Sequence, residues 1–429
     1  MATLANWQGN FKQRYGRFQN PIPEVNTFAD ELQFIQQDYR PGLGYNFPII
    51  VGNEHGQTAD ISNTAFAFND AIDSQILNAS LDGATIGVVG NVPYDVAFKG
   101  NNGAGNGSRG AAFWRPYDLK VKLLLQSAVL YRELLLLYGC GGASYTTPAC
   151  NIGVIGGSPS GTLDTPNTSR LTLASNAPGI WNQMAPGALV DIHNGSTPVA
   201  TGVTVQGYDP ATATLTLYKA GSGVTPAAGN IIVPYGWKVK SAVGLEAILL
   251  NQTEIFGIDA ALIPHWRAVQ MSAGGTLSRT TILGLAARLA SNGFRGGGKL
   301  YVSPASFSDL VVETFTLQRF DKNTDSVKQQ GADELEYKTS VGVIRVVVYP
   351  YMKQGEAFFM APGKSKRVGS TDITTKGDGP NDMFFLELQA NAGYQMRAMQ
   401  NQAPVLEIPY WFGIITGIVN SASSGATGV

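Results

Sequence analysis

Residues 119–138, LKVKLLLQSAVLYRELLLLY, form a segment long and apolar enough to be the central helix of the chain. Pro116 presets a helical φ just upstream, and Asp118 can accept hydrogen bonds from the N–H groups of the first turn. Gly139 predicts a left-handed stop. At 1.5 Å per residue the helix would be about 30 Å long. Its nine leucines cover more than one face, so we expect it to be pressed between two layers as a spine.

A membrane span is the other interpretation of this segment. Lys120, Lys122, Arg132 and Glu133 leave only residues 123–131 free of charge. A stretch of that length is less than half of the roughly 20 residues that a membrane-spanning helix needs. The sequence therefore predicts a buried helix and no membrane partner.

Composition points to a weakly charged protein rich in turns. The 429 residues predict two or three domains, and they include 51 glycines and 14% charged residues. The usual charged fraction is about 25%. A net charge of −1 excludes attraction of the whole molecule to nucleic acid or anionic lipid, so any nucleic-acid contact would be local. The low charge suggests that much of the surface lies against other chains.

The two cysteines, Cys140 and Cys150, flank a loop rich in Gly, Ser, Thr and Pro. They could form a disulfide if their Cα atoms approach within about 7 Å. Two thiols, and an amino terminus without the apolar run of a secretory signal, favour a reduced, intracellular origin. We expect thiols here and leave the pairing open.

The first 105 residues read as two extensions. Residues 1–40 carry four aromatic residues among polar ones, then a short helix at about 27–37, which predicts an arm that docks elsewhere or a frayed terminus. Residues 41–105 contain GLGYNFPIIVG and a second β-like run at 84–89. Pro48 and Pro93 favour edge or two-stranded pairing. We therefore expect an extended loop that lies on something else.

A glycine-rich stretch at 100–110 matches a dinucleotide-binding fingerprint in the spacing of its glycines alone. Gly105, Gly107 and Gly110 have the right spacing, but residues 111–116 intervene before the helix begins. The helix terminus would then stand too far from a pyrophosphate. We interpret the stretch as a flexible hinge, and a dinucleotide-dependent enzyme is the less favoured alternative.

Residues 141–238 change abruptly to short β-type runs, at 163–174, 188–193, 202–208, 212–218 and 230–233. They predict an inserted all-β domain, either a small barrel or a sandwich, used for display, interaction or stabilisation.

Residues 239–429 read as an α+β sheet domain. Helical patterns cover about 241–256 and 276–291, and a strand at 299–302 enters a helix through Ser303 and Pro304. Strands are predicted at 334–349, 357–360, 383–388 and 393–408.

Few residues suggest chemistry. His55, His193 and His265 fall in separate regions without metal-ligand spacing, and the acids at 321–325 and 372–382 are expected to be solvated. No nucleophile elbow, Walker loop or Cys-x-x-Cys occurs. We predict a structural protein with no catalytic residue, cofactor or metal.

One basic patch stands out. Arg345 lies on a predicted strand, and Lys364, Lys366 and Arg367 lie in a predicted loop, APGKSKRVGS. The patch could face nucleic acid or an acidic neighbour, and a solvated loop is the simplest interpretation.

The order of these segments resembles the major capsid protein of tailed bacteriophages, with the Hong Kong 97-type fold. The matching pieces are the aromatic arm, the loop with GLGYNFPIIVG, the spine helix, and the later segments GGKLYVSPASFSDL, YPYMKQGEAFFMAP and FFLELQANAGYQMRAM. They cover most of the chain except the insert.

The resemblance implies an α+β capsid fold. It has an N-terminal arm (1–40), an extended β loop (41–105), a peripheral domain with the spine helix (106–140), and an axial domain with returning peripheral-domain strands (239–429). The inserted all-β domain (141–238) departs from the family plan, and we expect it to face outward and brace adjacent subunits. Candidate intersubunit contacts are Trp7, Phe11, Tyr15, Phe18, Tyr45, Phe47, Lys364, Lys366 and Arg367.

The implied function is structural. Copies would assemble as hexamers and pentamers into an icosahedral shell in the host cytoplasm and remain in the virion. Portal, scaffolding or decoration proteins would be partners, and packaged double-stranded DNA would contact the inner face non-specifically. Another self-assembling phage protein, a tail or tube subunit that forms rings or filaments, is the main alternative.

Overall fold

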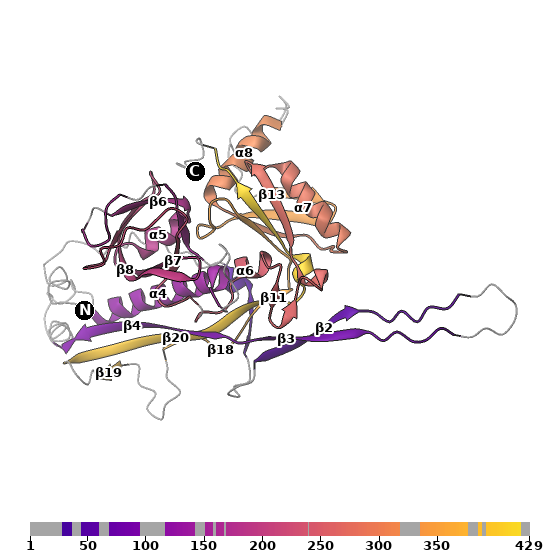
Figure 1. The fold of residues 1–429 in the computed structure, drawn as a ribbon, viewed down its shortest axis with the longest axis horizontal. Helices are drawn as coiled ribbons and strands as arrows, with labels where there is room; N and C mark the ends of the chain where they lie inside the picture. The colour runs from indigo at the N-terminus through magenta and orange to yellow at the C-terminus, as the bar shows by residue number, and fades with distance from the viewer. Residues whose placement is uncertain are drawn as a thin grey trace, which may run out of the picture.

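The structure is a computed structural model that describes residues 28–36, 44–59, 68–94, 116–141, 151–157, 160–166, 169–238, 240–317, 335–375, 385–387 and 392–421. Figure 1 shows a long helix along a sheet, a barrel on one side of the helix, a second sheet with helices, and a hairpin that projects far from the rest. Trp7, Phe11, Tyr15, Phe18, Cys150 and the glycine-rich stretch lie outside the described residues.

The spine is helix α4, Pro116–Tyr138, as predicted. Its second half is buried on every side, since Leu134 to Leu137 have no exposed surface, while Leu125 in the first half is 36% exposed. The helix contacts strands β4 and β20 on one side and helices α2 and α6 elsewhere. The expected burial between layers is confirmed for the second half.

The glycine after the spine helix has a different role from the predicted one. Gly139 is not among the residues with positive φ, so the predicted left-handed stop is wrong. A Cβ atom at Gly139 would lie 2.3 Å from the carbonyl oxygen of Ala242. Glycine is needed here because another segment of backbone passes too close for a side chain.

The sheet along the spine helix has the order β1-β18-β20-β19, with β4 also paired to β20. Its strands are β1 Gln33–Gln36, β4 Ala84–Pro93, β18 Ser365–Thr374, β19 Phe385–Glu387 and β20 Gly393–Leu406. Only β1 runs parallel to its partner, β18; β4 and β20 are antiparallel over ten residue pairs.

This sheet corrects three predictions. The helix expected at 27–37 is a single turn, α2 Phe28–Glu31, followed by strand β1. The run at 84–89 belongs to the sheet through β4 and not to the extended loop. Residues 365–374 form strand β18, so the predicted basic loop is largely a strand.

The extended loop is an antiparallel hairpin of β2, Tyr45–Gly52, and β3, Gln75–Leu81. It points away from the rest of the chain (Figure 1). The backbone N–H of Ser80 donates to the carbonyl of Phe256 at 3.0 Å and fixes the root of the hairpin.

Residues 153–234 form a closed barrel in the order β10-β5-β6-β9-β8-β7, which decides between the barrel and sandwich alternatives. The strands are β5 Gly153–Ile155, β6 Arg170–Ser175, β7 Leu189–Asn194, β8 Thr197–Asp209, β9 Thr214–Tyr218 and β10 Ile231–Pro234. Helix α5, Pro178–Met184, was not predicted, and its Trp181 is fully buried.

The chain enters and leaves the barrel through a neck, which we define as residues 139–141 and 241–244. The N–H of Gly141 donates to Ala242, and the N–H of Gly244 donates to Gly139, both at 3.0 Å. A Cβ atom at Gly244 would lie 2.3 Å from the backbone nitrogen of Gly139. The two passages therefore touch backbone to backbone.

The second sheet has the order β13-β21-β17-β14-β16-β15. Its strands are β13 Val269–Gly275, β14 Gly298–Val302, β15 Leu335–Thr339, β16 Gly342–Val348, β17 Ala357–Met360 and β21 Gly413–Ile418. Helices α7, Arg279–Ser291, and α8, Pro304–Leu317, accompany it. The predicted Ser303 cap of α8 is confirmed, because its Oγ accepts from the N–H of Ser306 at 3.2 Å.

The helix predicted at about 241–256 is shorter than expected. Helix α6 covers Leu245–Leu249, and a small hairpin of β11, Glu254–Ile255, and β12, Ile258–Asp259, follows it. Two short 3-10 helices, η2 Pro264–Trp266 and η3 Pro409–Trp411, lie near the base of the long β2/β3 hairpin.

Candidate functional site

The hairpin exposes apolar side chains at a distance from the core. Along β2, Tyr45, Phe47 and Ile49 alternate with more exposed residues, as expected for a strand with one covered face. Ile50 and Ile76 are opposite each other across the hairpin and are 68% and 58% exposed. The exposed large apolar residues of this segment are Ile50, Phe68, Ile72, Ile76 and Leu77. An isolated hairpin of this kind is a marker of an interaction surface.

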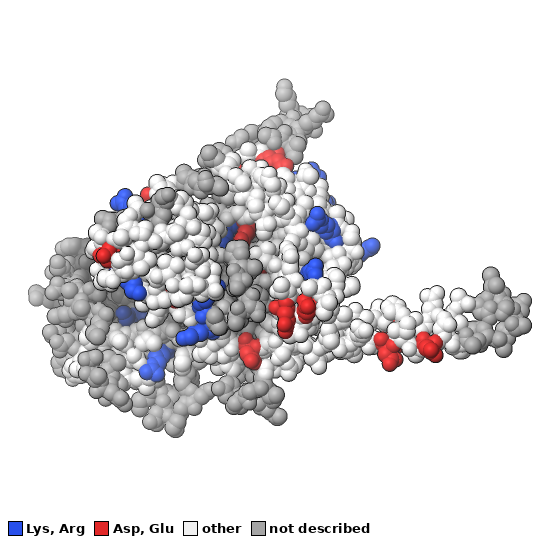
Figure 2. All heavy atoms as spheres, in the orientation of Figure 1, with Lys and Arg blue, Asp and Glu red and all other residues white. Residues whose placement is uncertain are grey.

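The hairpin segment is also acidic. Between residues 44 and 94 the sequence has Glu54, Asp60, Asp70, Asp73 and Asp82, and no Lys or Arg. Figure 2 shows acidic side chains, and no basic ones, along the described part of the projecting hairpin. A surface that covers the hairpin must therefore combine apolar contact with neutral or positive charge.

A groove with a volume of 970 Å³ lies where the inner face of β2 meets η2 and η3. Phe47 packs on Trp266 with ring centroids 6.2 Å apart, and His265 packs on Tyr410 at 5.0 Å. His55 and His265, predicted in separate regions, both line this groove. Within the described residues no group of three His, Cys, Asp or Glu side chains could hold a metal ion.

Most side chains of the predicted basic patch bind partners within the chain. Lys364 and Lys366 both pair with Glu407, with Lys364 at 3.7 Å. Arg367 is 6% exposed and donates to the carbonyl of Leu32 at 3.1 Å and to Gln402 at 2.9 Å. For Arg367, the expectation of a solvated loop residue is wrong. It ties β1 to the sheet.

Asp372, predicted to be a solvated loop acid, instead lies between two arginines. Its Oδ1 is 3.3 Å from Arg367 and 3.5 Å from Arg132. Partial burial would raise the pKa of Asp372, but the N–H of Ile373 and the two guanidinium groups outweigh it and hold that pKa below its usual value. Asp30 lies 3.2 Å from Arg132, so the same network also reaches α2.

Glu133 is a buried acid whose role the sequence did not reveal. It has no exposed surface and accepts from the hydroxyl of Tyr349 at 2.6 Å and the N–H of Ala29 at 3.1 Å. Burial raises the pKa of Glu133 despite these bonds. The signal in the sequence was a charged residue inside the apolar run LYRELLLL, which we used only to exclude a membrane span.

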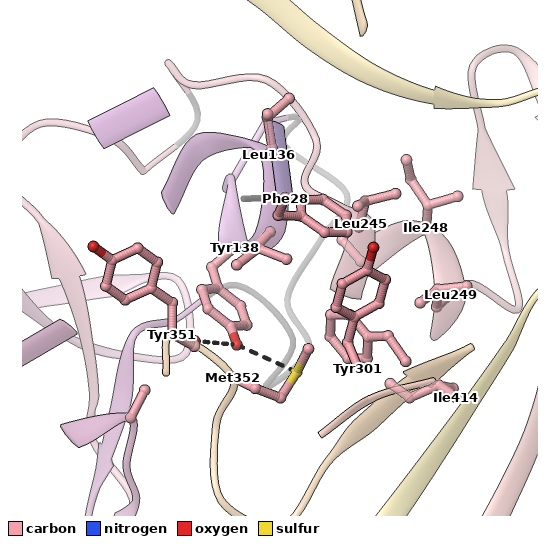
Figure 3. Close-up of a cluster of buried hydrophobic side chains, with 14 of the residues drawn as sticks. Phe28, Leu136, Tyr138, Leu245, Ile248, Leu249, Tyr301, Tyr351, Met352 and Ile414 are labelled. Carbon is pink, nitrogen blue, oxygen red and sulfur yellow. Dashed lines mark hydrogen bonds between the residues drawn. The ribbon is translucent and has the colours of Figure 1, made fainter. Parts of the chain in front are cut away.

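The core between the spine helix and the second sheet is aromatic. Figure 3 shows Tyr138, at the end of α4, reaching Tyr351 and Met352, with Phe28 and Tyr301 nearby. The hydroxyl of Tyr138 donates to the carbonyl of Tyr351 at 2.9 Å. The spine helix and the second sheet therefore share one continuous core.

Comparison with solved structures finds a similar fold over nearly the full length of the chain. The capsid of cyanophage A-1(L) matches with a TM-score of 0.51 and 9% identity, over 95% of this chain and 97% of that chain. The capsid of the empty GTA particle matches at 0.49 with 6% identity, over 98% and 100%. A chain of Mycobacterium phage Adephagia matches at 0.43 with 12% identity, over 98% and 99%. No protein-family model and no curated protein matches the sequence.

The chain has the fold of a phage capsid protein. It is a mixed α+β fold with many strands, as the sequence predicted. On this capsid fold, Tyr45 and Phe47 lie on the inner face of the hairpin, and the basic residues Lys364, Lys366 and Arg367 lie on or beside β18. Whether any of them contacts a second subunit stays a prediction. In the described part of the chain, no helix is long and apolar enough to cross a membrane.

Proposed function

We propose that this protein is the major capsid protein of a tailed bacteriophage, of the Hong Kong 97 type, and that it self-assembles into the icosahedral head shell around double-stranded DNA. The observation that carries the proposal is the match to the cyanophage A-1(L) capsid over nearly the full length of both chains. The protein would then reside in the virion, after assembly in the host cytoplasm.

The projecting hairpin supports assembly on physical grounds. A two-stranded hairpin in water is marginal by itself, and this one presents Ile50, Ile72 and Ile76 to solvent. Covering those side chains with another subunit removes apolar surface from water. Contact across many copies would make the hairpin a clasp between neighbours.

The parts of the fold take the family's roles in this proposal. The spine helix with the β4/β20 sheet is the peripheral domain, the second sheet with α7 and α8 is the axial domain, and the barrel is the insert. Subunits form hexamers and pentamers with a portal and, where needed, scaffolding or decoration proteins. The barrel faces outward and braces adjacent subunits, and DNA is held without sequence preference.

Light scattering and negative-stain microscopy of the recombinant protein, alone and with its genetic neighbours, test the proposal. Closed polyhedral particles are the expected result. Rings or filaments would indicate a tail or tube subunit instead. A protein that stays a monomer or dimer under every condition contradicts the proposal.

The bracing role of the barrel has its own test. Because the neck brings Gly141 and Ala242 into backbone contact, residues 142–240 can be replaced by a short glycine linker without moving the ends apart. We expect shells that assemble but dissociate at lower urea concentration than the parent. Shells of unchanged stability would remove the bracing role and leave the capsid assignment standing.

A further inference from the structure

The turn at residues 349–356, between β16 and β17, contacts three parts of the subunit at once. We call it the junction turn. On the barrel side, the N–H of Gln354 donates to the carbonyl of Asn176 at 2.8 Å. Gly179, in α5, lies so close that a Cβ atom there would stand 2.5 Å from the carbonyl oxygen of Pro350. On the spine side, Tyr349 donates to Glu133 at 2.6 Å.

Lys353 is the centre of the junction turn. Its backbone N–H donates to the hydroxyl of Tyr138 at 3.0 Å, which joins the turn to the end of the spine helix. Its Nζ lies 2.7 and 2.6 Å from the two carboxylate oxygens of Glu246, and 4.5 Å from the ring centroid of Tyr138. The side chains of Lys353 and Glu246 are each 1% exposed.

Glu246 belongs to the segment that leaves the barrel. It lies in α6, which begins directly after the neck residue Gly244. The ion pair therefore connects the junction turn, which touches the barrel through Asn176 and Gly179, to the chain that carries the barrel. Glu356 faces the same cluster, and its buried Oε2 has no hydrogen-bond partner among the described residues.

A fully buried ion pair needs a reason other than stability. Desolvation of both charges offsets most of their attraction, and apolar residues of similar volume are often as stable or more so. The pair differs from apolar packing in direction, because its bonds are satisfied in one arrangement only. An apolar contact tolerates sliding and tilting that would leave an ammonium or carboxylate buried alone.

We propose that the Lys353–Glu246 pair is a positioning element that fixes the angle at which the barrel stands on the spine helix and the second sheet. Besides the two passages of the neck, the barrel contacts the rest of the chain through backbone atoms at Asn176 and Gly179 and through Trp237, whose ring centroid lies 6.0 Å from that of Tyr131 in the spine helix. The ion pair holds the turn that carries the contacts at Asn176 and Gly179. Each subunit therefore presents its barrel in one orientation, whatever the barrel then touches.

Distances between two spin labels test this in the isolated chain, independently of assembly. In a Cys150→Ser background, in which Cys140 is buried, labels are placed at the exposed positions Ser196→Cys, at a barrel turn, and Ala287→Cys, on α7. The parent should give one narrow distance distribution by pulsed electron resonance. Lys353→Met with Glu246→Leu removes both charges of the pair together. Parent and variants share a Glu356→Gln substitution, so that no carboxylate of the cluster is left without its cation.

The double variant should fold and give a broader or shifted distribution. The single Lys353→Met variant leaves a buried carboxylate alone, so it should unfold at lower urea concentration than the double variant. Lys299→Met is the control, because it breaks an ion pair of 2.8 Å between strand β14 and Glu31 of helix α2 that does not involve the junction turn, and it should leave the distribution unchanged.

A parental distribution in the double variant overturns the proposal, since the apolar contacts would then suffice to hold the barrel. If the double variant does not fold, Lys353→Met with Glu246→Met decides. It keeps unbranched side chains of similar length but removes both charges and the bonds between them, so a parental distribution in that variant would equally overturn the role of the ion pair.

Discussion

Replacing Ile50 and Ile76 with serine should separate the stability of the subunit from its assembly. The two side chains face each other across β2 and β3 and are 68% and 58% exposed in the single chain. Because they contact little of their own subunit, the cost to its free energy of unfolding should stay below about 1 kcal/mol.

The cost to assembly is larger if another subunit covers the hairpin. Full burial of an isoleucine contributes about 2 kcal/mol, and together the two expose the equivalent of about one and a quarter side chains. The double variant should therefore lose about 2.5 kcal/mol for each docked hairpin. At about 1.4 kcal/mol per factor of ten, the threshold concentration for assembly should rise roughly 60-fold.

Light scattering against protein concentration measures the threshold concentration for assembly. Urea unfolding of the unassembled chain measures its free energy of unfolding. Ile50→Val with Ile76→Val is the control, since it keeps an apolar contact and should shift the threshold much less. Unchanged assembly of the serine variant at the parental threshold would refute the clasp, because the exposed isoleucines would then meet no partner.

Three further predictions concern the fold. Leu135→Ala, at a site without exposed surface, should lower the free energy of unfolding by about 2–5 kcal/mol in a urea titration. Gly244→Ala should prevent the neck from closing and lower the melting temperature, whereas Gly207→Ala, where a Cβ atom meets nothing within 4 Å, should not. The folded-state pKa of Asp372 is depressed, so its stabilising contribution is present above the unfolded value of 3.8 and is lost as pH falls through the folded value. Asp372→Asn should therefore lower the melting temperature at pH 7 and make little difference at about pH 2.

The helices with one apolar stripe could be predicted from the sequence, because their signals are local. Helix α7 ends at Asn292 and Gly293 as expected, and its predicted inner residues Ile282 and Leu285 are buried. Strand β17, residues 357–360, was predicted with its observed bounds. In each case the apolar periodicity and the residues that begin and end the element lie close together in the sequence.

Strand pairing over long distances could not be predicted. The runs at 45–51 and 84–89 look alike, but the first pairs with β3 and the second with β20, more than 300 residues later along the chain. Strand β3, QILNASL, is only half apolar because the hairpin has no core on its outer side. No local sequence feature indicates which of the two runs pairs with a neighbouring strand and which pairs with a distant one.

The polar interior of the sheet along the spine helix explains why the sequence predicts a loop where strand β18 lies. Its sequence, SKRVGSTDIT, lacks the apolar alternation of a strand with a hydrophobic face. In the structure, Arg367 and Asp372 bond to each other and to Gln402 of β20, so polar contacts replace apolar ones there. A pattern based on hydrophobicity cannot recognise such a strand.

Charged residues that hold the chain together differ in their surroundings from the exposed hairpin residues proposed to contact a second copy. The charged residues chosen from the sequence, Lys366 and Arg367, have partners within the chain, whereas Ile50 and Ile76 of the hairpin are 68% and 58% exposed. Internal ion pairs favour one arrangement of the chain, and if a second copy covers the hairpin as proposed, burial of its apolar side chains would add free energy that the single chain does not gain. In the proposed shell, assembly would depend on exposed apolar surface, and the shape of each chain would depend on buried charge.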